Sequence, residues 1–168
     1  VYENEAHQAN LAQSLALINQ PIAQSAGKTG SGTTVAVLDT GVDYTRAAFG
    51  YCTAPGAPAG CNVIAARDFA PQDNLLDAHG HGTNVAGIVV GVAPGAKIAA
   101  LDVFNGGSAY TADIIAAIDW SIQNQALYNI VAINMSLGIS GSRYLSYCNS
   151  SWATTPFRNA RTAGILPV

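Results

Sequence analysis

The sequence predicts an α/β fold, a three-layer sandwich in which helices cover both faces of a mostly parallel sheet. Apolar segments typical of buried strands alternate with helical segments, as in a parallel sheet whose crossover connections are helices. The composition agrees, because 49% of the 168 residues are hydrophobic and only 10% are charged. A chain of this length corresponds to one domain with a sizeable core. The strands begin near Thr34, Asn62, Lys97 and Ile130.

Residues 1–29 are expected to form an arm that precedes the first strand. Apolar residues at helical spacing predict a short amphipathic helix over Leu11–Asn19, ended by Pro21. The glycines within 27–32 suggest a nucleotide-binding loop. However, a phosphate-binding loop follows its strand and opens a helix, whereas these glycines come before the strand. We therefore do not expect nucleotide binding.

Two segments place chemically active side chains beside glycines. The first strand ends in Asp39, followed by Thr40 and Gly41, and a carboxylate at such a turn is positioned to orient a histidine. Further along, His81 lies between glycines and precedes the small residues 85–88, which predict a closely packed, buried helix. This setting holds an imidazole still while the backbone passes close to a substrate. Asp39 and His81 are therefore candidate catalytic residues.

The histidine segment also allows a metal interpretation. Asp77, His79 and His81 occupy alternate positions, and two histidines with a carboxylate can bind zinc. Further ligands would be needed, and the only other histidine, His7, lies far upstream. The other interpretation is that His79 is a loop residue beside a catalytic His81.

The later elements follow from periodicity and turn chemistry. Lys97–Phe104 is strongly apolar, as expected for a strand that is covered on both faces. Thr111 is expected to cap the next helix, with Asp113 in its first turn. A last helix is predicted over 156–163, closed by Gly164. The helix after Thr111 should bury Ile114, Ile115, Ile118 and Ile122, and strands are expected at Ile130–Met135 and from Ile165.

The chain contains three cysteines, an odd number. Cys52 and Cys61 are separated by eight residues rich in alanine, proline and glycine, so they could close a small disulfide ring; two free thiols are the alternative. Cys148 is left over, which in a secreted protein suggests a partner elsewhere.

The charge pattern favours neither nucleic acid nor a membrane as a partner. The formal net charge is −3, and there is no basic stripe for phosphates or anionic lipids. No run of eighteen apolar residues could cross a bilayer. No signal peptide begins the chain, so we expect any targeting segment to have been removed or to lie outside this numbering.

Four segments carry a family resemblance. VAVLDTGVD, HGHGTNVAGIV, GVAPGAKIAALDVF and INMSLG occur in this order, and together they resemble the catalytic domain of subtilisin-like serine proteases, from about Gly30 to the last residue. The resemblance implies that 30–168 is the N-terminal part of such a domain, truncated, in a secreted endopeptidase. The triad order in this family is Asp, His, Ser, so Asp39 would be the orienting acid and His81 the general base. Residues 1–5 would be either the tail of a pro-segment or an ordinary extended arm.

The third member of the triad is missing from the sequence. The family's serine stands in a Gly-Thr-Ser-Met-Ala-like turn, and neither this turn nor the Ala-Ala-Gly-Asn that supplies an oxyanion-hole amide occurs here. The resemblance therefore implies a serine-bearing C-terminal part, on the same or a second chain, and an inactive 168-residue chain when alone. Two alternatives remain: a naturally inactive, subtilase-derived binding protein, and a metal-dependent hydrolase that uses His79 and His81.

The resemblance also implies where a peptide substrate would bind. The segment Asn105–Tyr110 corresponds to an extended edge that pairs with the substrate backbone, a case of β-augmentation. Gly107, Ser108 and Ala109 would make those backbone contacts, and Tyr110 would wall a side-chain pocket. A plain turn is the alternative.

A second substrate-binding segment is implied at the end of the strand Ile130–Met135. Ser136 and Gly138 would bond the peptide backbone from the opposite side, and Leu137 would line subsites for the acyl part. Ser136 is not a candidate nucleophile, because it stands at a strand end rather than in a nucleophile turn.

No cofactor or metal is expected. The calcium-binding insertion that subtilisins often carry between the histidine helix and the next strand is absent, so calcium at that position is not supported. Asp43 is interpreted as structural, bonding nearby backbone groups in a turn. Asp102, inside a predicted strand, has no functional explanation from the sequence.

Overall fold

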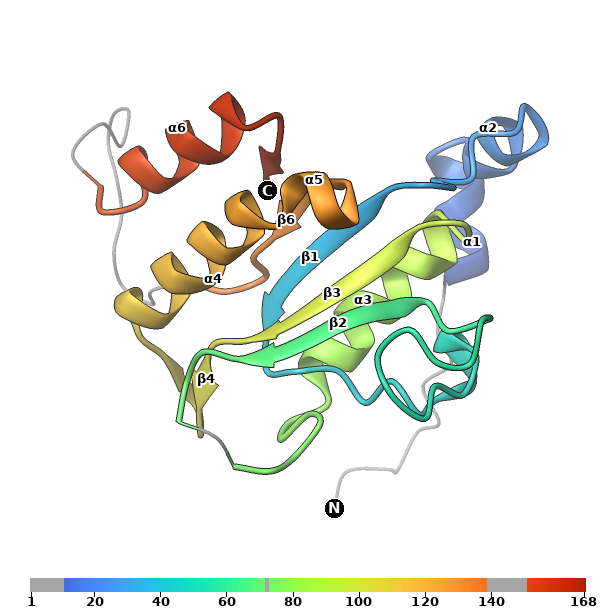
Figure 1. Ribbon diagram of the computed structural model, residues 1–168. Coiled ribbons are helices and arrows are strands. Elements are labelled where there is room, and N and C mark those ends of the chain that lie inside the picture. The colour runs from blue at the N-terminus through green and yellow to red at the C-terminus, as the bar shows by residue number, and fades with distance from the viewer. Residues whose placement is uncertain (1–10, 72, 139–150) are drawn as a thin grey trace, which may run out of the picture.

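The computed structural model describes residues 11–71, 73–138 and 151–168. Its centre is a five-stranded sheet with the order β2-β3-β1-β6-β7, and all neighbouring strands are parallel (Figure 1). The strands of this sheet are β1 Thr34–Asp39, β2 Val63–Asp68, β3 Lys97–Asp102, β6 Ile130–Asn134 and β7 Leu166–Pro167, and a separate hairpin consists of β4 Phe104–Asn105 and β5 Ser108–Ala109. The helices are α1 Leu11–Leu17, α2 Gln20–Ser25, η1 Ala47–Phe49, α3 His81–Val92, α4 Thr111–Gln123, α5 Gln125–Tyr128 and α6 Thr154–Thr162.

Helices cover both faces of the sheet, as the contacts of β1 show. Successive residues of a strand point to opposite faces of the sheet. Val37 belongs to a buried cluster that includes Ala86 and Val90 of α3. The next residue, Leu38, belongs to the other cluster, which includes Ile118 of α4 and a residue of α6. The predicted three-layer α/β sandwich is therefore confirmed.

The N-terminal arm differs from the predicted single helix. The helix α1 ends at Leu17, Asn19 adopts a left-handed conformation with φ 57°, and α2 begins at Gln20. Pro21 lies in the first turn of α2, where its missing N–H costs nothing, so it starts a second helix rather than ending the first. The Gln20 side chain donates a 2.8 Å bond to the Val92 carbonyl and so ties the arm to the end of α3.

The helix α3 is buried on one side only. Gly82, Ala86 and Val90 are buried against the sheet, whereas Ile88 is 46% exposed. The expected buried helix over 85–88 is therefore buried on its inner face, while its outer face is exposed. The small residues do allow close packing on the inner face, where Ala86 has no exposed surface.

The strand predicted over Lys97–Phe104 is divided. β3 ends at Asp102, and the chain continues into β4, which pairs with the antiparallel β5. The segment 105–110 is therefore mostly a short hairpin beyond the carboxyl end of β3. Thr111 is the first residue of α4 rather than its cap, because the extended Tyr110 already occupies the N-cap position. Of the predicted stripe, Ile114 and Ile118 are buried, while Ile115 and Ile122 are partly buried.

Cys52 and Cys61 form a disulfide, which confirms the predicted ring. The Lys97 ammonium donates a 2.8 Å bond to the Cys61 carbonyl and fixes the loop against β3. Cys148 lies outside the described residues. Among the described helices, none is long and apolar enough to cross a membrane.

Candidate active site

Asp39 and His81 meet at the carboxyl end of the sheet. Asp39 is the last residue of β1 and His81 is the first residue of α3, and their Oδ1 and Nδ1 atoms lie 2.7 Å apart. The Asp39 side chain is 1% exposed, whereas the His81 side chain is 54% exposed. The carboxylate is therefore buried behind the imidazole, and the ring remains accessible to a reacting group.

Glycines make this close approach possible. A Cβ atom on Gly82 would overlap the carbonyl oxygen of Gly41 and would stand 3.1 Å from Asp39 Cβ. Gly41 itself has a φ of 88°, and a Cβ on it would overlap the Leu76 carbonyl oxygen. A side chain at either glycine would push α3 away from β1.

The Asp77 carboxylate holds the loop that leads into α3. Its Oδ1 accepts bonds from the amides of His79 (3.0 Å) and Gly80 (2.8 Å) and from the Thr40 hydroxyl (2.8 Å). Its Oδ2 accepts from the Thr83 amide (2.9 Å) and the Thr83 hydroxyl. Asp77 therefore serves as the cap for the first turn of α3, and a carboxylate is favourable at this helix end.

These bonds also decide the protonation of Asp77. Burial acts to raise the pKa of its carboxyl group, but the bonds from Thr83, Thr40 and the amide of His79 outweigh burial, and the pKa lies below its ordinary value. Asp77 therefore stays ionised at neutral pH.

Thr40 links the acid to the histidine helix. Its amide donates to Asp39 Oδ1 at 2.8 Å, and its hydroxyl accepts from the Gly82 amide at 3.0 Å while donating to Asp77. Asp39 Oδ2 is buried and has no hydrogen-bond partner among the described residues. The orientation of the Asp39 carboxylate is therefore fixed through Oδ1 by the Thr40 amide and the His81 ring.

The metal interpretation of the histidine segment receives no support from the geometry. The Asp77 carboxylate binds the loop, the His79 ring Nε2 lies 2.7 Å from the Gly106 carbonyl oxygen, and His81 faces Asp39. The three side chains thus have three different partners. Within the described part of the chain, no group of three or more His, Cys, Asp or Glu side chains could hold a metal ion.

A family model with the description Subtilase family matches residues 30–168. The chain belongs to the subtilase family. It is 35% identical over 133 residues to Subtilisin E of Bacillus subtilis (strain 168), an alignment that covers 72% of this chain and 31% of that protein. It is 32% identical over 151 residues to an alkaline protease of Alkalihalobacillus alcalophilus, which covers 81% of this chain and 35% of that protein.

Solved structures agree with this assignment. The S41 Psychrophilic Protease shares 33% identity with this subtilase chain at a TM-score of 0.56, covering 83% of this chain and 45% of the other. MycP1 without its N-terminal propeptide has a TM-score of 0.56 at 23% identity, covering 92% of this chain and 46% of the other, and shows the fold alone. The subtilase chain thus spans less than half the length of these relatives.

The two segments predicted to bind substrate lie beside one cavity of about 810 Å³. Two predicted residues are outside its lining: Tyr110 is 58% exposed at the N-cap of α4, and the Ser136 hydroxyl donates a 3.0 Å bond to Asn134 Oδ1. The cavity brings the hairpin and the end of β6 together with apolar side chains of α4 and α6. Its lining includes the predicted residues Gly107, Ser108, Ala109, Leu137 and Gly138, together with Ile114, Met135 and Phe157.

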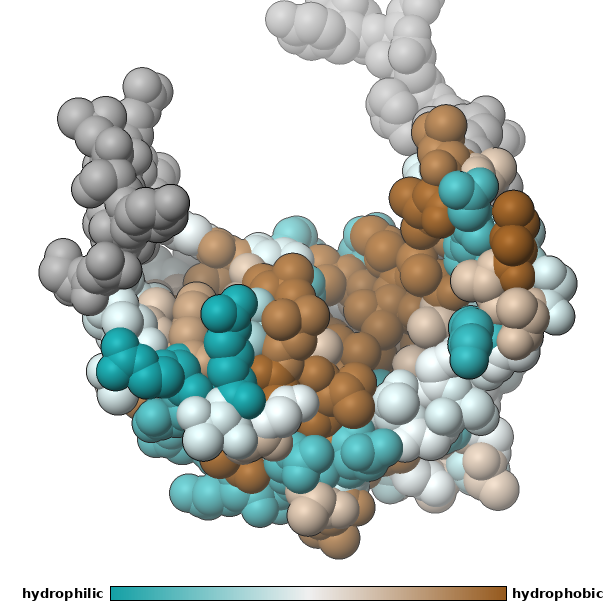
Figure 2. All heavy atoms as spheres, turned by 90° about the horizontal axis from the view of Figure 1, so that it is seen from above, coloured by the Kyte–Doolittle hydropathy of each residue, from teal (hydrophilic) through white to brown (hydrophobic). Residues whose placement is uncertain are grey.

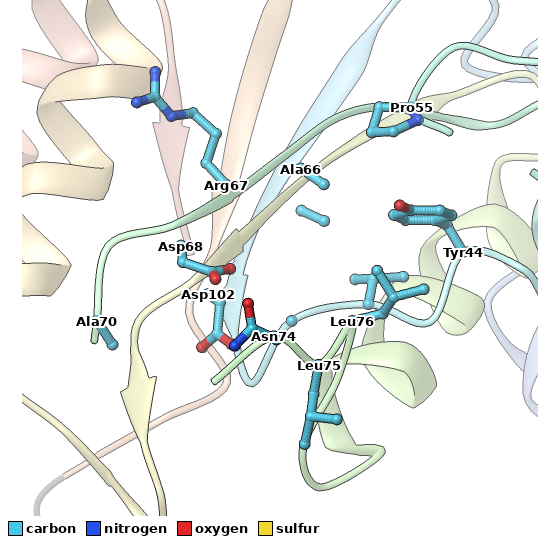
Figure 3. A pocket seen from close by; sticks show the side chains of 13 residues that line it. Tyr44, Pro55, Ala66, Arg67, Asp68, Ala70, Asn74, Leu75, Leu76 and Asp102 are labelled. Atoms are coloured by element: carbon cyan, nitrogen blue, oxygen red, sulfur yellow. The ribbon is translucent and has the colours of Figure 1, made fainter. Parts of the chain in front are cut away.

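A second cavity of about 630 Å³ lies on the α3 face of the sheet, next to the turn at Gly41 (Figure 3). Asp68 and Asp102 face one another across its base, and Tyr44 closes its far side. Burial raises the pKa of the Asp102 carboxyl group to about 6, against the opposing bond from the Phe104 amide.

Sequence reasoning missed the roles of Asp77 and Asp102. For Asp77 a local signal existed, since an aspartate shortly before the first residues of a helix is typical of a capping position. For Asp102 the bond to the Phe104 amide is local, but its burial and its charged neighbours come from other segments of the chain.

Proposed function

We propose that the complete protein is a secreted serine endopeptidase, in which this chain supplies the acid Asp39 and the base His81. The observation that carries the proposal is the 2.7 Å bond between the buried Asp39 Oδ1 and Nδ1 of the accessible His81 ring. Family membership supports it, because the same pair is the acid–base part of a Ser-His-Asp triad.

In this function Asp39 determines which nitrogen of His81 is the base. Nδ1 keeps its proton and donates a hydrogen bond to Asp39, so the lone pair is on Nε2. Nε2 takes the proton of a serine hydroxyl as the serine oxygen attacks the peptide carbonyl carbon. The Asp39 carboxylate stabilises the resulting imidazolium. The Nε2 proton then passes to the leaving amine, and a water molecule repeats the sequence to release the acyl group.

We propose that the serine belongs to a C-terminal part of the protease, on the same or a second chain. The sequence holds no Gly-Thr-Ser-Met-Ala-like turn, and it aligns with only 31% of Subtilisin E. The arm exposes Leu17, Ile18 and Ile22, and Figure 2 shows further apolar side chains in the hollowed centre of the same face. Exposed apolar surface of this kind is suited to be covered by another part of a protein. The 168-residue chain alone should be inactive.

A polypeptide is the proposed substrate. The backbone of β5 would pair with an extended peptide, while Gly138 and the end of β6 would hold it from the opposite side. The cavity between them offers Met135, Leu137 and Phe157 to an apolar substrate side chain. The net charge of −3 favours neither nucleic acid nor a membrane surface as a partner. The Cys52–Cys61 disulfide supports an extracellular location.

Labelling of the purified protein with a fluorophosphonate probe for serine hydrolases tests this proposal. A denaturing gel and an intact mass of each band locate the label. The expected result is a label on a serine outside this sequence, on a second band or a heavier single chain. A complete protein that takes up no label at any concentration of probe would contradict the proposal and indicate a non-catalytic subtilase.

A further inference from the structure

Three aspartates end three adjacent strands at matching positions. In the sheet register, Asp102 of β3 is the partner of Asp39 of β1 on one side and of Asp68 of β2 on the other. Side chains at matched positions of neighbouring strands point to the same face of a sheet. Asp102 therefore lies on the same side of the sheet as the acid of the candidate dyad, one strand away.

Asp102 binds the start of the hairpin and lies beside the turn that follows Asp39. Its Oδ1 accepts a 2.8 Å bond from the amide of Phe104, the first residue of β4. Its Oδ2 lies 3.3 Å from the position that a Cβ on Gly41 would take, in the turn that follows Asp39. The neighbouring Val103 amide donates to the Asp39 carbonyl at 3.0 Å. Asp102 and Val103 together thus connect the hairpin to the strand that carries Asp39.

We propose that Asp102 is a positioning residue whose ionised carboxylate fixes the β4–β5 hairpin relative to the strand that carries Asp39, and that this contact loosens when the carboxylate takes up a proton. The inference rests on the proposed function, because only there does the hairpin bind substrate. Asp102 does not touch the reacting atoms. It sets the position of the substrate backbone relative to the dyad.

The surroundings of Asp102 shift the pH at which it takes up a proton toward neutrality. The residue is 6% exposed, and burial is the main cause that raises its pKa to about 6. The carboxylates of Asp68 on β2 and of Asp73 and Asp77 in the loop before α3 raise the pKa further.

In the part of the chain that the structure describes, no cation compensates this charge within the cavity. Arg67 is the only cationic side chain among the described residues that line the cavity, and Figure 3 shows its guanidinium directed away from Asp102. The Arg67 guanidinium lies instead near the rings of Phe69 (5.8 Å) and Trp120 (5.9 Å), on the other face of the sheet. Because an ionised acceptor binds an N–H more strongly than a neutral one, protonation weakens the bond to Phe104.

The first test uses the Phe104 amide as a direct reporter of this bond. In ¹⁵N-labelled protein, we expect the Phe104 amide resonance to titrate between pH 4.5 and 8 with a midpoint near 6. In the Asp102→Asn variant the titration should vanish, while the amide oxygen still accepts the bond. A Phe104 resonance that stays constant in the wild-type protein, or that titrates equally in the variant, would overturn the proposal.

The Thr45 amide is a matched internal control. It donates to Asp43 Oδ1 at 3.2 Å, so it reports a bond of the same kind. The hydroxyl of Thr45 is the main cause that lowers the pKa of Asp43 below its ordinary value. The Thr45 resonance should therefore stay constant over the range in which the Phe104 resonance moves.

The second test measures peptide hydrolysis by the complete protease as a function of pH. In the wild type, KM for an extended peptide should rise about three- to tenfold as the pH falls through 6, the loss expected for one weakened hydrogen bond. In Asp102→Asn, KM should lose this pH dependence, whereas Asp102→Ala should show a raised KM at every pH. A change confined to kcat, with KM constant, would contradict the positioning role.

The two tests separate the inference from the proposed function. An active protease with a constant Phe104 resonance would overturn the role of Asp102 alone. A complete protein without peptidase activity whose Phe104 resonance still titrates would overturn the proposed function, and with it the assignment of the hairpin to a substrate.

Discussion

The carbonyl oxygen of Gly41 occupies the place that a side chain on Gly82 would need. Gly41 follows the strand that carries Asp39, and Gly82 follows His81, so this contact sets how closely α3 approaches β1. The 2.7 Å bond between Asp39 and His81 depends on that approach.

We therefore expect Gly82→Ala to separate the acid from the base. The overlap should lower the free energy of unfolding by about 1–3 kcal/mol, and misplacement of the ring should lower kcat/KM of the complete protease by about 100-fold or more. Gly87→Ala is the matched control, since a Cβ on Gly87 meets nothing within 4 Å. Thermal unfolding and peptide kinetics would show both changes, and a Gly82→Ala enzyme as active as Gly87→Ala would refute the packing argument.

Asp39→Asn should remove the acceptor that orients the His81 ring. The asparagine would fill the same space, but its amide cannot hold the ring in the required tautomer, so kcat should fall by about 10⁴-fold. Asp43→Asn, at an exposed turn beside Thr45, is the control and should leave kcat within about twofold. Steady-state kinetics at several pH values would measure the effect, and an Asp39→Asn enzyme with wild-type kcat would mean that Asp39 is only structural.

Asp77→Ala should destabilise the start of α3. Loss of the cap and of its other hydrogen bonds should lower the free energy of unfolding by about 2–3 kcal/mol at pH 7. The native pKa of Asp77 is lowered, so its contribution is present above its ordinary pKa of 3.8 and is lost as the pH falls through the native value. Urea unfolding at pH 7 and pH 3 would measure this, with Asp119→Ala as an exposed control. An Asp77→Ala difference that is as large at low pH as at pH 7 would contradict the electrostatic explanation.

Asp102→Asn should stabilise the protein at neutral pH. The native pKa of about 6 lies above the ordinary 3.8, so the native state binds the proton more tightly, and ionisation of Asp102 costs stability as the pH rises through this range. The expected gain is about 1–3 kcal/mol at pH 7.5, and it should disappear near pH 4. Calorimetry across this range measures it, and a variant less stable than the wild type at pH 7.5 would show that the ionised carboxylate is a net stabilising group.

Much of the fold could be predicted because the strands are short apolar runs in regular alternation with helices. Asp39 and His81 were predicted for the same reason, because each lies in a strong local sequence pattern. Only the end of β1 and the start of α3 have to come together to place the two side chains in contact. The hydrogen bond of Asp77 with Thr40 could not be predicted in this way, since it depends on where the loop before α3 folds back across the end of the sheet. The bond of Asp102 with Phe104 spans only two residues, but it requires the strand to end at Asp102, and the apolar run does not reveal that end.

The errors of prediction have equally local causes. Pro21 lies in the first turn of α2, and a proline after a helical pattern is compatible with the end of one helix or the start of another, so spacing alone does not distinguish the two cases. The exposed side of α3 was missed because a run of small apolar residues indicates close packing without saying on how many sides. The break at Val103 was missed because an apolar residue continues the pattern of a strand even where the strand ends.

The most direct test of the central proposal is the catalytic efficiency of the complete protease after His81→Ala. The proposed function predicts that kcat/KM for a peptide falls by about 10⁴-fold or more. Asn84→Ala, an exposed change three residues further along the same helix, should stay within about twofold of the wild type. Retention of wild-type efficiency by His81→Ala, with Asn84→Ala also active, would contradict the assignment of His81 as the base.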